Sequence, residues 1–264
     1  MNYILNLVFF CLSAFSIKVN SVILNRQFLE DLYGPSYINE TAFGLCCVEI
    51  TSIGENTFDG LFNLQRLELY RNQLSSLNRF TFAGAENLEY LYLGSNQLSF
   101  VDALTFNKLI NLVDLRLSEN QLAFLAESAF VGLSKLQVLY LGSNQLVNIE
   151  ANLFTDLVNL ETLYLFDNAI ANLTSGQFND LTSLNELDLS GNQLENLNKF
   201  VFSHLKNIKN LSLQNNKLAN IDRDIFLGLV NLQAVYLANN PISIKQPSYV
   251  KQLCSTNPKC KIII

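Results

Sequence analysis

The 264-residue sequence contains ten tyrosines, whose side chains combine an apolar ring with a hydrogen-bonding hydroxyl. Four of the ten tyrosines are separated by multiples of 24 residues: Tyr92, Tyr140, Tyr164 and Tyr236. Such a side chain buries a large apolar area while its hydroxyl keeps a polar partner, which favours contact with another molecule over catalysis. The spacing indicates that a repeated structural unit places these rings on one surface.

Residues that commonly carry out catalysis are sparse. The single histidine, His204, lies between Phe202 and Leu205, and nothing around it in the sequence suggests a base. The sequence has no glycine-rich phosphate loop, no metal-ligand spacing and no nucleophile motif. Its acidic residues are thinly spread and indicate a solvated face, as at Glu68, Asp114, Glu186 and Asp188. We expect no enzymatic activity, no cofactor and no metal site.

The composition excludes two classes of protein. Apolar residues make up 49% of the chain and charged residues 15%, which is too apolar for a disordered chain. The formal net charge is −6, and the 17 lysines and arginines are scattered along the sequence. Binding to nucleic acid without sequence preference needs basic residues gathered on one face, so we expect no nucleic-acid partner.

Asparagine marks a repeat with a constant length of 24 residues. It recurs without insertion at Asn72, Asn96, Asn120, Asn144, Asn168, Asn192, Asn216 and Asn240. Around each asparagine lies the same aliphatic frame, as in Leu88, Leu91, Leu93 and Asn96. Each repeat also has a phenylalanine, and a leucine follows three residues later except after Phe82, where Ala85 follows.

The frame predicts stacked coils. Two leucines with one residue between them point to the same side of a short strand, and the residue between them points to the other side. A single strand of this kind cannot bury its apolar face, so neighbouring copies must stack in parallel. The asparagine amide has both a donor and acceptor, and a column of asparagines can satisfy backbone groups that would otherwise be buried unpaired.

This frame resembles the leucine-rich-repeat superfamily, in the 24-residue form common in extracellular proteins. The resemblance covers about Leu64 to Ile242, with a degenerate coil reaching back to about Phe43. It implies an α/β fold, a curved solenoid with a parallel sheet on its concave side and short helical or irregular segments on its convex side. It also implies that the concave side binds a protein. The repeats are similar to those of Slit-like guidance proteins, variable lymphocyte receptors and small leucine-rich proteoglycans.

The predicted organisation has four parts: a signal peptide at 1–21, an N-terminal cap and degenerate repeat at 22–63, eight repeats at 64–242, and a short C-terminal cap at 243–264. The apolar run from Tyr3 to Ile17 is shorter than the roughly 20 residues that span a bilayer. Cleavage is expected after Ser16 or near Ser21. The alternatives are a buried N-terminal helix and an uncleaved anchor.

Three sequons fit a secreted chain with no membrane span after cleavage. Their asparagines are Asn39, Asn172 and Asn210. Asn210 falls on a predicted strand, where a glycan would block the C-terminal third of the concave side. We therefore predict an extracellular glycoprotein whose ligands contact its first five repeats.

The cysteines divide between the two ends of the solenoid. Four remain after removal of Cys11 with the signal peptide, and eight strand spacings of roughly 4.8 Å separate the two pairs, too far for a bridge between the ends. We expect a disulfide between Cys254 and Cys260 in an oxidising compartment. Cys46 and Cys47 are adjacent, and three states stay open for them: a strained vicinal bridge, pairing with a partner chain, or buried inert thiols.

We expect a ligand to bind on the concave side. The residues expected there with the strongest potential for contact are Tyr70, Tyr90, Tyr92, Asp114, Arg116, Tyr140, Tyr164, Phe166 and Tyr236. The alternative is that tyrosine favours strands and the column stacks for stability. The predicted function is secreted recognition of a protein ligand in immunity, adhesion or signalling. The alternatives are a structural component of the extracellular matrix and an inhibitor of a secreted enzyme.

Overall fold

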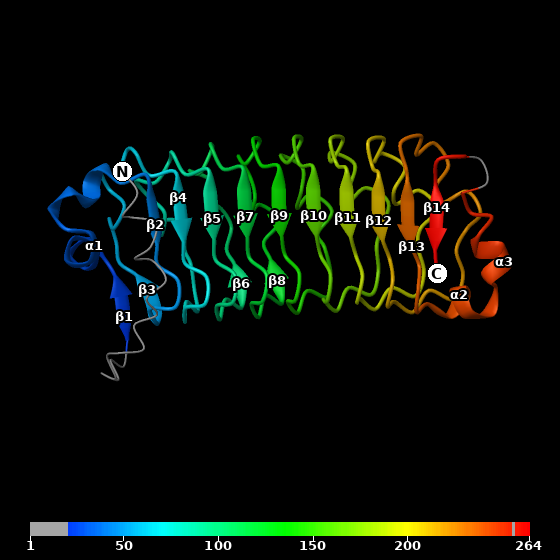
Figure 1. The fold of residues 1–264 in the computed structure, drawn as a ribbon, viewed down its shortest axis with the longest axis horizontal. Coiled ribbons are helices and arrows are strands. Elements are labelled where there is room, and N and C mark those ends of the chain that lie inside the picture. The colour runs from blue at the N-terminus through cyan, green and yellow to red at the C-terminus, as the bar shows by residue number, and fades with distance from the viewer. Residues whose placement is uncertain (1–20, 255–256) are drawn as a thin grey trace, which may run out of the picture.

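The computed structural model describes residues 21–254 and 257–264, so residues 1–20 of the predicted signal peptide lie outside the described residues. The described chain winds into a solenoid of stacked coils (Figure 1). Ten strands form one sheet, and every neighbouring pair is parallel. In spatial order the strands are β2 (Ala42–Gly44), β4 (Arg66–Glu68), β5 (Tyr90–Tyr92), β7 (Asp114–Arg116), β9 (Val138–Tyr140), β10 (Thr162–Tyr164), β11 (Glu186–Asp188), β12 (Asn210–Ser212), β13 (Ala234–Tyr236) and β14 (Lys261–Ile263). The predicted parallel-sheet solenoid is confirmed.

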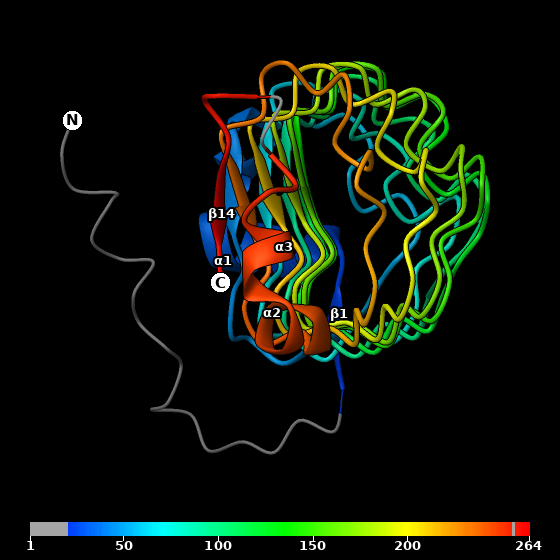
Figure 2. The same ribbon diagram turned by 90° about the vertical axis from the view of Figure 1, so that its right-hand side faces the viewer.

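The strands pair without any slip of register. Leu67 pairs with Leu91, and Leu91 pairs with Leu115, so the inward leucines form one fully buried column. The residues on either side of each leucine point outward, as the period of two predicts. Seen along the solenoid, the strands of the central coils lie set back from the two end strands, so the outer face of the sheet is concave (Figure 2).

Phenylalanines fill the interior opposite the sheet. Seven buried rings stack from coil to coil, with successive ring centroids 5.9 to 6.4 Å apart. They are Phe58, Phe82, Phe106, Phe130, Phe154, Phe178 and Phe202. The segments that return the chain along this far side are turns, apart from a two-stranded parallel sheet of β6 (Phe100–Val101) and β8 (Phe124–Leu125). The repeats therefore hold their shape through side-chain stacking rather than through helices.

The repeated asparagines are buried and hydrogen-bonded. In Asn144, Nδ2 donates to the carbonyl of Leu141 in its own coil at 3.0 Å and to that of Leu117 in the preceding coil at 3.1 Å. Its Oδ1 accepts from the N–H of Leu122 at 3.0 Å. The other seven asparagines repeat this arrangement. The predicted asparagine column is confirmed, and it joins each coil to its neighbour.

A second polar column, which the sequence did not suggest, runs along the turns that precede the strands. The side chains in it donate to a backbone carbonyl 25 residues earlier in the chain. They are Asn87, Asn111, Asn159, Ser183, Asn207 and Asn231. These residues are mostly exposed, and their bonds join each of these turns to the turn of the preceding coil.

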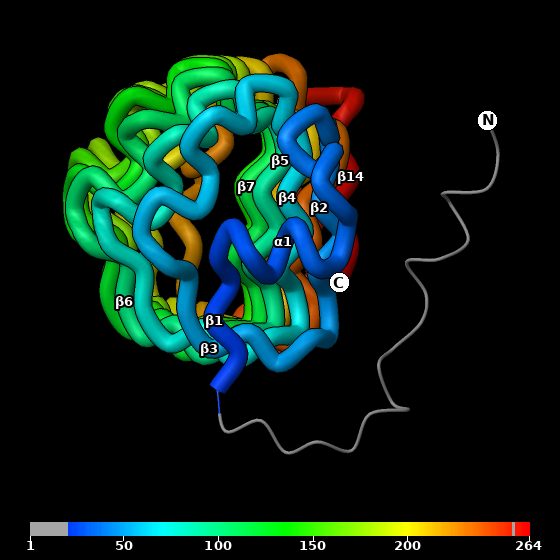
Figure 3. Tube along the Cα trace, turned by 90° about the vertical axis from the view of Figure 1, so that its left-hand side faces the viewer, coloured from blue at the N-terminus to red at the C-terminus, as the bar shows by residue number. Residues whose placement is uncertain are grey.

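The N-terminal end is closed by α1 (Arg26–Tyr33) and the 3-10 helix η1 (Pro35–Asn39), beside a two-stranded parallel sheet of β1 (Val22–Leu24) and β3 (Ile50–Ile53) (Figure 3). The Asn25 side chain caps α1 by accepting from the N–H of Phe28. The Tyr33 hydroxyl accepts from the N–H of Gly44 and donates to the carbonyl of the same residue. Because Phe43 packs inward opposite Leu67, the degenerate first coil keeps its strand.

The C-terminal end is closed by α2 (Pro241–Lys245), α3 (Pro247–Val250) and the last strand. The Tyr249 hydroxyl donates to the carbonyl of Ile221 at 2.8 Å, which ties α3 to the final repeat. A disulfide joins Cys254 to Cys260, with their Cα atoms 5.7 Å apart. In the described part of the chain, no helix has the length and apolar character needed to cross a bilayer.

We predict that Asn144→Leu destabilises the protein by about 1 to 3 kcal/mol, because the buried N–H of Leu122 loses its acceptor. The carbonyls of Leu117 and Leu141 keep one donor each, from Asn120 and Asn168. Urea unfolding followed by circular dichroism measures the change. The control is Gln145→Leu at the exposed neighbouring position, which we expect to change stability by less than about 0.5 kcal/mol. Equal stabilities of the two variants would contradict the structural role of the asparagine column.

Candidate functional site on the sheet face

The sheet face consists of the outward-pointing residues of the ten strands and of the residues just after each strand. The central residue of this face on β5, β7, β9 and β10 is Tyr92, Arg116, Tyr140 and Tyr164 in turn. They are neighbours because the register holds residues 24 positions apart side by side. The repeat length therefore sets the order of side chains across the face.

Aromatic rings and guanidinium groups alternate over these strands. The Arg116 guanidinium lies 4.6 Å from the ring centroid of Tyr92 and 4.8 Å from that of Tyr140. Tyr140 in turn contacts Tyr164, with ring centroids 4.5 Å apart. Arg66 at one end and Phe166 at the other complete the aromatic–arginine row, which we define as Arg66, Tyr90, Tyr92, Arg116, Tyr140, Tyr164 and Phe166.

Asp114 holds the centre of the row in place. Its carboxylate accepts two hydrogen bonds from Arg116, from Nε at 3.0 Å and from Nη2 at 2.8 Å. The hydroxyl of Tyr92 donates to the same carboxylate at 3.3 Å, and Asp114 is 7% exposed. This hydrogen bonding raises the pKa of Arg116, while burial and the Asp114 charge raise the pKa of Tyr92. The arginine is thus a fixed, internally paired cation.

Burial also raises the pKa of Tyr164, and the Glu186 charge and the Tyr140 hydroxyl add to the effect. At the other end of the row, Arg66 donates to the Tyr92 hydroxyl at 3.1 Å and lies 3.5 Å from the Glu68 carboxylate. The row is therefore connected by hydrogen bonds as well as by ring contacts. Its side chains are ordered before any ligand arrives, which lowers the entropic cost of binding.

A hollow of about 460 Å³ opens beside the row. It is lined by Glu68, Tyr70, Tyr92, Gly94, Ser95, Arg116, Ser118, Glu119 and Tyr140. The floor of the hollow is formed by Gly94 and Ser118. They occupy the repeat position that Tyr70 and Phe166 occupy in coils on either side. The next position, Gly142, is covered by the Phe166 ring, since a Cβ built there would lie 2.5 Å from that ring. Small residues between two aromatic ones leave the space open.

Two polar groups at the hollow differ in their access to solvent. Among the buried side-chain polar atoms of the described residues, the Ser118 Oγ is the one with no hydrogen-bond partner. Leaving such a hydroxyl unpaired costs about 1 to 3 kcal/mol. The Glu119 carboxylate accepts from the Ser95 hydroxyl at 2.7 Å and is exposed. The hollow therefore presents the Glu119 carboxylate to solvent.

Cys46 lies at the edge of this site. It is a free thiol, which excludes a vicinal bridge, and it occupies the repeat position equivalent to Tyr70. The hydrogen bond between the Tyr70 hydroxyl and Cys46 raises the pKa of Tyr70 to about 12, and burial contributes further. Pairing of Cys46 with a partner chain stays a prediction.

The structure brings together most of the residues proposed from the sequence, but not all of them. Tyr70, Tyr92, Arg116 and Tyr140 line the hollow. Tyr236 lies three strands from Tyr164 and lines a separate, polar hollow of about 260 Å³ with Glu186, Asn210, Ser212 and Gln214. Four further residues of the hollow were not predicted from the sequence: Gly94, Ser95, Ser118 and Glu119. Glu68 was predicted only as part of a solvated face. The run of small residues between Tyr70 and Phe166 was the available signal.

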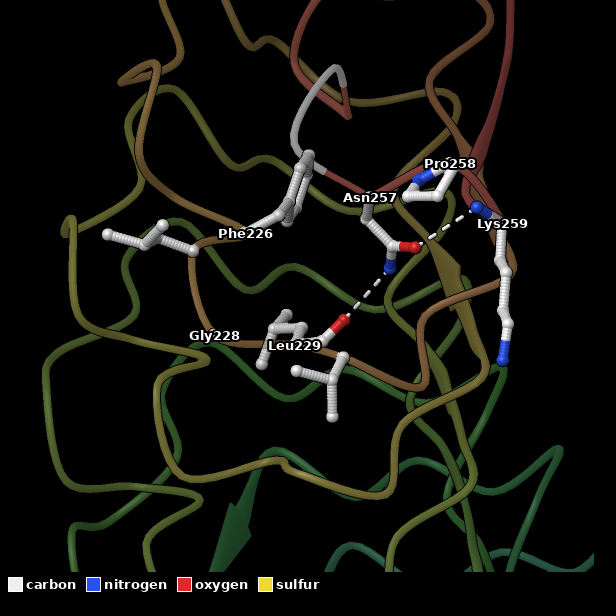
Figure 4. Close-up of a pocket in the computed structure, with 8 residues that line it drawn as sticks. Phe226, Gly228, Leu229, Asn257, Pro258 and Lys259 are labelled. Carbon is white, nitrogen blue, oxygen red and sulfur yellow. Dashed lines mark hydrogen bonds between the residues drawn. The ribbon is translucent and has the colours of Figure 1, made fainter.

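A further hollow, of about 340 Å³, lies at the C-terminal end of the core (Figure 4). Phe226, the last phenylalanine of the repeats, and Asn257 of the cap line it. Asn257 donates to the carbonyls of Leu229 and Leu232, both at 3.1 Å. The hollow lies between the turn of the last repeat and the C-terminal cap, and the hydrogen bonds of Asn257 join the two. No group of three or more potential metal ligands occurs among the described residues.

The predicted glycosylation sites differ in their surroundings. Asn39 ends η1 and Asn172 lies on a turn, and both side chains are exposed. Asn210 is half-buried on the sheet face of β12, opposite Ala234 of β13. Modification of the three residues stays a prediction.

A parallel-sheet solenoid with a buried asparagine in each coil defines a repeat scaffold with open columns of side chains on its concave face. Five stretches, at residues 41–98, 86–146, 110–170, 134–194 and 182–242, match the leucine rich repeat family. The chain therefore belongs to the leucine-rich repeat family, as its resemblance predicted. No curated protein is significantly similar to the sequence.

Two solved structures are similar over most of this chain. TLR13, in the TLR13–ssRNA13 complex, is 32% identical with a TM-score of 0.75, and the match covers 82% of this chain and 30% of that chain. A leucine-rich repeat protein of Leptospira interrogans is 30% identical with a TM-score of 0.68, covering 81% and 53% respectively. This chain therefore spans less than two thirds of the length of either protein.

We predict that Cys46→Ala lowers the pKa of Tyr70 from about 12 toward the ordinary tyrosine value of about 10, because its hydrogen-bond partner is lost. Since the folded-state pKa is raised, the associated stability is present below about pH 10 and is lost as the pH rises toward 12. Ultraviolet titration of tyrosinate checks this, with Tyr70→Phe in each background as the control that identifies the step. An unchanged step in Cys46→Ala would contradict the hydrogen bond.

Proposed function

We propose that this chain is a secreted recognition protein that binds a protein ligand on its sheet face, centred on the aromatic–arginine row. Tyrosine and arginine are the residue types most enriched at the energetic centres of protein interfaces. Here they are half-buried or exposed and already fixed by Arg116, Asp114 and their neighbours. The single observation that carries the proposal is this preordered row.

The repeat scaffold of the family supports binding, and we propose that the chain acts without catalysis. A matrix protein and an inhibitor of a secreted enzyme are the alternatives that share the same surface. Retention in extracellular matrix after secretion would favour the first, and recovery of a soluble enzyme as partner would favour the second.

Nucleic acid is the other ligand class to test, because TLR13 is similar in structure and its complex contains ssRNA13. In this chain Arg116 is paired with Asp114 at 2.8 Å, and Arg66 lies 3.5 Å from the Glu68 carboxylate. The formal net charge of −6 also disfavours phosphate. We therefore favour a protein ligand.

We predict that Tyr140→Ala combined with Tyr164→Ala weakens ligand binding at least about tenfold, since each truncated anchor costs about 1 kcal/mol or more. The tagged chain and the double variant are used to capture partners from extracellular fluid, and the recovered proteins are quantified by mass spectrometry. Nuclease treatment before capture identifies any partner held through RNA.

A matched control is Ser212→Ala combined with Tyr236→Ala, which alters the same face two and three strands away from Tyr164. Unfolding curves of both variants must match that of the unaltered chain, so that lost binding reports on contact. Undiminished capture by the Tyr140 and Tyr164 variant would remove the row from the interface.

Secretion has its own test. Expressed in a mammalian cell line, the chain is expected in the medium with an N-terminus after Ser16 or near Ser21 and with glycans at Asn39, Asn172 and Asn210. Peptide mass spectrometry with and without glycosidase measures both features. A chain that stays inside the cell with Met1 in place would contradict secretion, and an unmodified Asn210 would free the C-terminal third of the sheet face.

A further inference from the structure

We propose that the hollow between Tyr70 and Tyr140 receives one basic side chain, a lysine or an arginine, of the protein ligand. This inference rests on the proposed function and specifies its chemistry. It follows from three properties of the hollow: its shape, the existing pairing of its guanidinium group, and the availability of its acceptors.

The shape suits a single long side chain. The floor is formed where Gly94 and Ser118 replace the aromatic residues found at Tyr70 and Phe166 in the same column of the repeat. Two coils at roughly 4.8 Å per strand make the opening about 10 Å wide. The rings of Tyr70, Tyr92 and Tyr140 provide the apolar wall, against which the methylene groups of a lysine or arginine pack.

The guanidinium that lines the hollow is already paired with a carboxylate. Arg116 makes a bidentate pair with Asp114, and its guanidinium lies between the rings of Tyr92 and Tyr140. The Tyr92 hydroxyl donates to Asp114 while it accepts from Arg66. An anionic ligand would therefore meet a guanidinium whose charge Asp114 already balances.

The acceptors are available. Glu119 accepts one hydrogen bond, from the Ser95 hydroxyl, and its other lone pairs face solvent. Glu68 meets Arg66 only at 3.5 Å, the weakest ion pair of the row. An ammonium or guanidinium group has three to five donors and no acceptor, which complements this set.

The local charge agrees with this assignment. Among the residues that line the hollow, two carry carboxylates, Glu68 and Glu119, and one carries a guanidinium group, Arg116. One cation from a ligand neutralises the excess. A glutamate or aspartate side chain would instead add a third negative charge beside Glu119, so the hollow selects basic over acidic side chains.

The experiment tests the hollow directly, without the natural partner. Blocked pentapeptides with one central lysine, arginine, norleucine or glutamate between glycines are titrated into the full chain, and its backbone amide NMR spectra are recorded. The lysine and arginine peptides are expected to give saturable shifts at Gly94, Ser95, Ser118 and Glu119, and the binding should weaken with added salt. The norleucine and glutamate peptides are expected to give none.

The test variant is Glu68→Gln with Glu119→Gln. The matched control is Asp188→Asn with Asp167→Asn, which removes two carboxylates from the equivalent repeat positions outside the hollow. The test variant is expected to lose at least about tenfold in affinity for the lysine peptide, the effect of one charge-assisted hydrogen bond. The control should bind as the unaltered chain does.

Three results would overturn the inference: no saturable shift with lysine or arginine, equal binding of norleucine, or equal losses in test and control variants. Its failure is separable from failure of the proposed function. If the basic peptides do not bind while the Tyr140 and Tyr164 variant still loses its partner, only the basic side chain is excluded. If the basic peptides bind while that variant keeps its partner, the row is not the interface.

Discussion

The hydrogen bonds of the buried asparagines determine the geometry on which every other feature depends. Each amide joins two coils and fixes the chain at the bend that follows a strand, as Asn144 does with Leu117 and Leu122. The bonds are 2.8 to 3.1 Å long, so the asparagines form one continuous column. The constant repeat length of 24 residues places equivalent side chains in straight columns inside and outside the coil.

The columns explain how one set of side-chain contacts on the sheet face can stabilise the sheet and also shape the proposed recognition surface. Rings and guanidinium groups that stack on neighbouring strands, such as Tyr92, Arg116 and Tyr140, stabilise the sheet by about 0.5 to 1 kcal/mol per exposed contact. The same contacts hold the rings in the orientation that a partner would meet. Stacking for stability and binding are therefore compatible explanations of the tyrosine column, because a preordered surface loses less entropy on association.

Properties set by periodicity could be predicted from the sequence, whereas properties set by individual side-chain conformations could not. The alternation of Leu91 and Tyr92 along the strand predicts that the leucine points inward and the tyrosine points outward. One such conformation is that of Phe166, whose ring lies over Gly142 and leaves the hollow open beside it. Another is that of Arg116, whose charge is balanced by its hydrogen bond to Asp114. The caps have no period, so strand β2, with Phe43 in the place of a leucine, was visible only as a degenerate coil.

The separation of core and surface columns also explains why the two halves of the sheet face differ. Because inward residues and asparagines specify the coil, an outward position can change without altering the fold. The central outward column has Tyr92, Arg116, Tyr140 and Tyr164 in its first part, and then Asp188 and Ser212. Rings can stack only where consecutive coils supply them, so the aromatic row ends at Tyr164 and Tyr236 stands apart. The location of the proposed binding surface thus follows from where large outward residues are consecutive, in a scaffold that is otherwise uniform along its length.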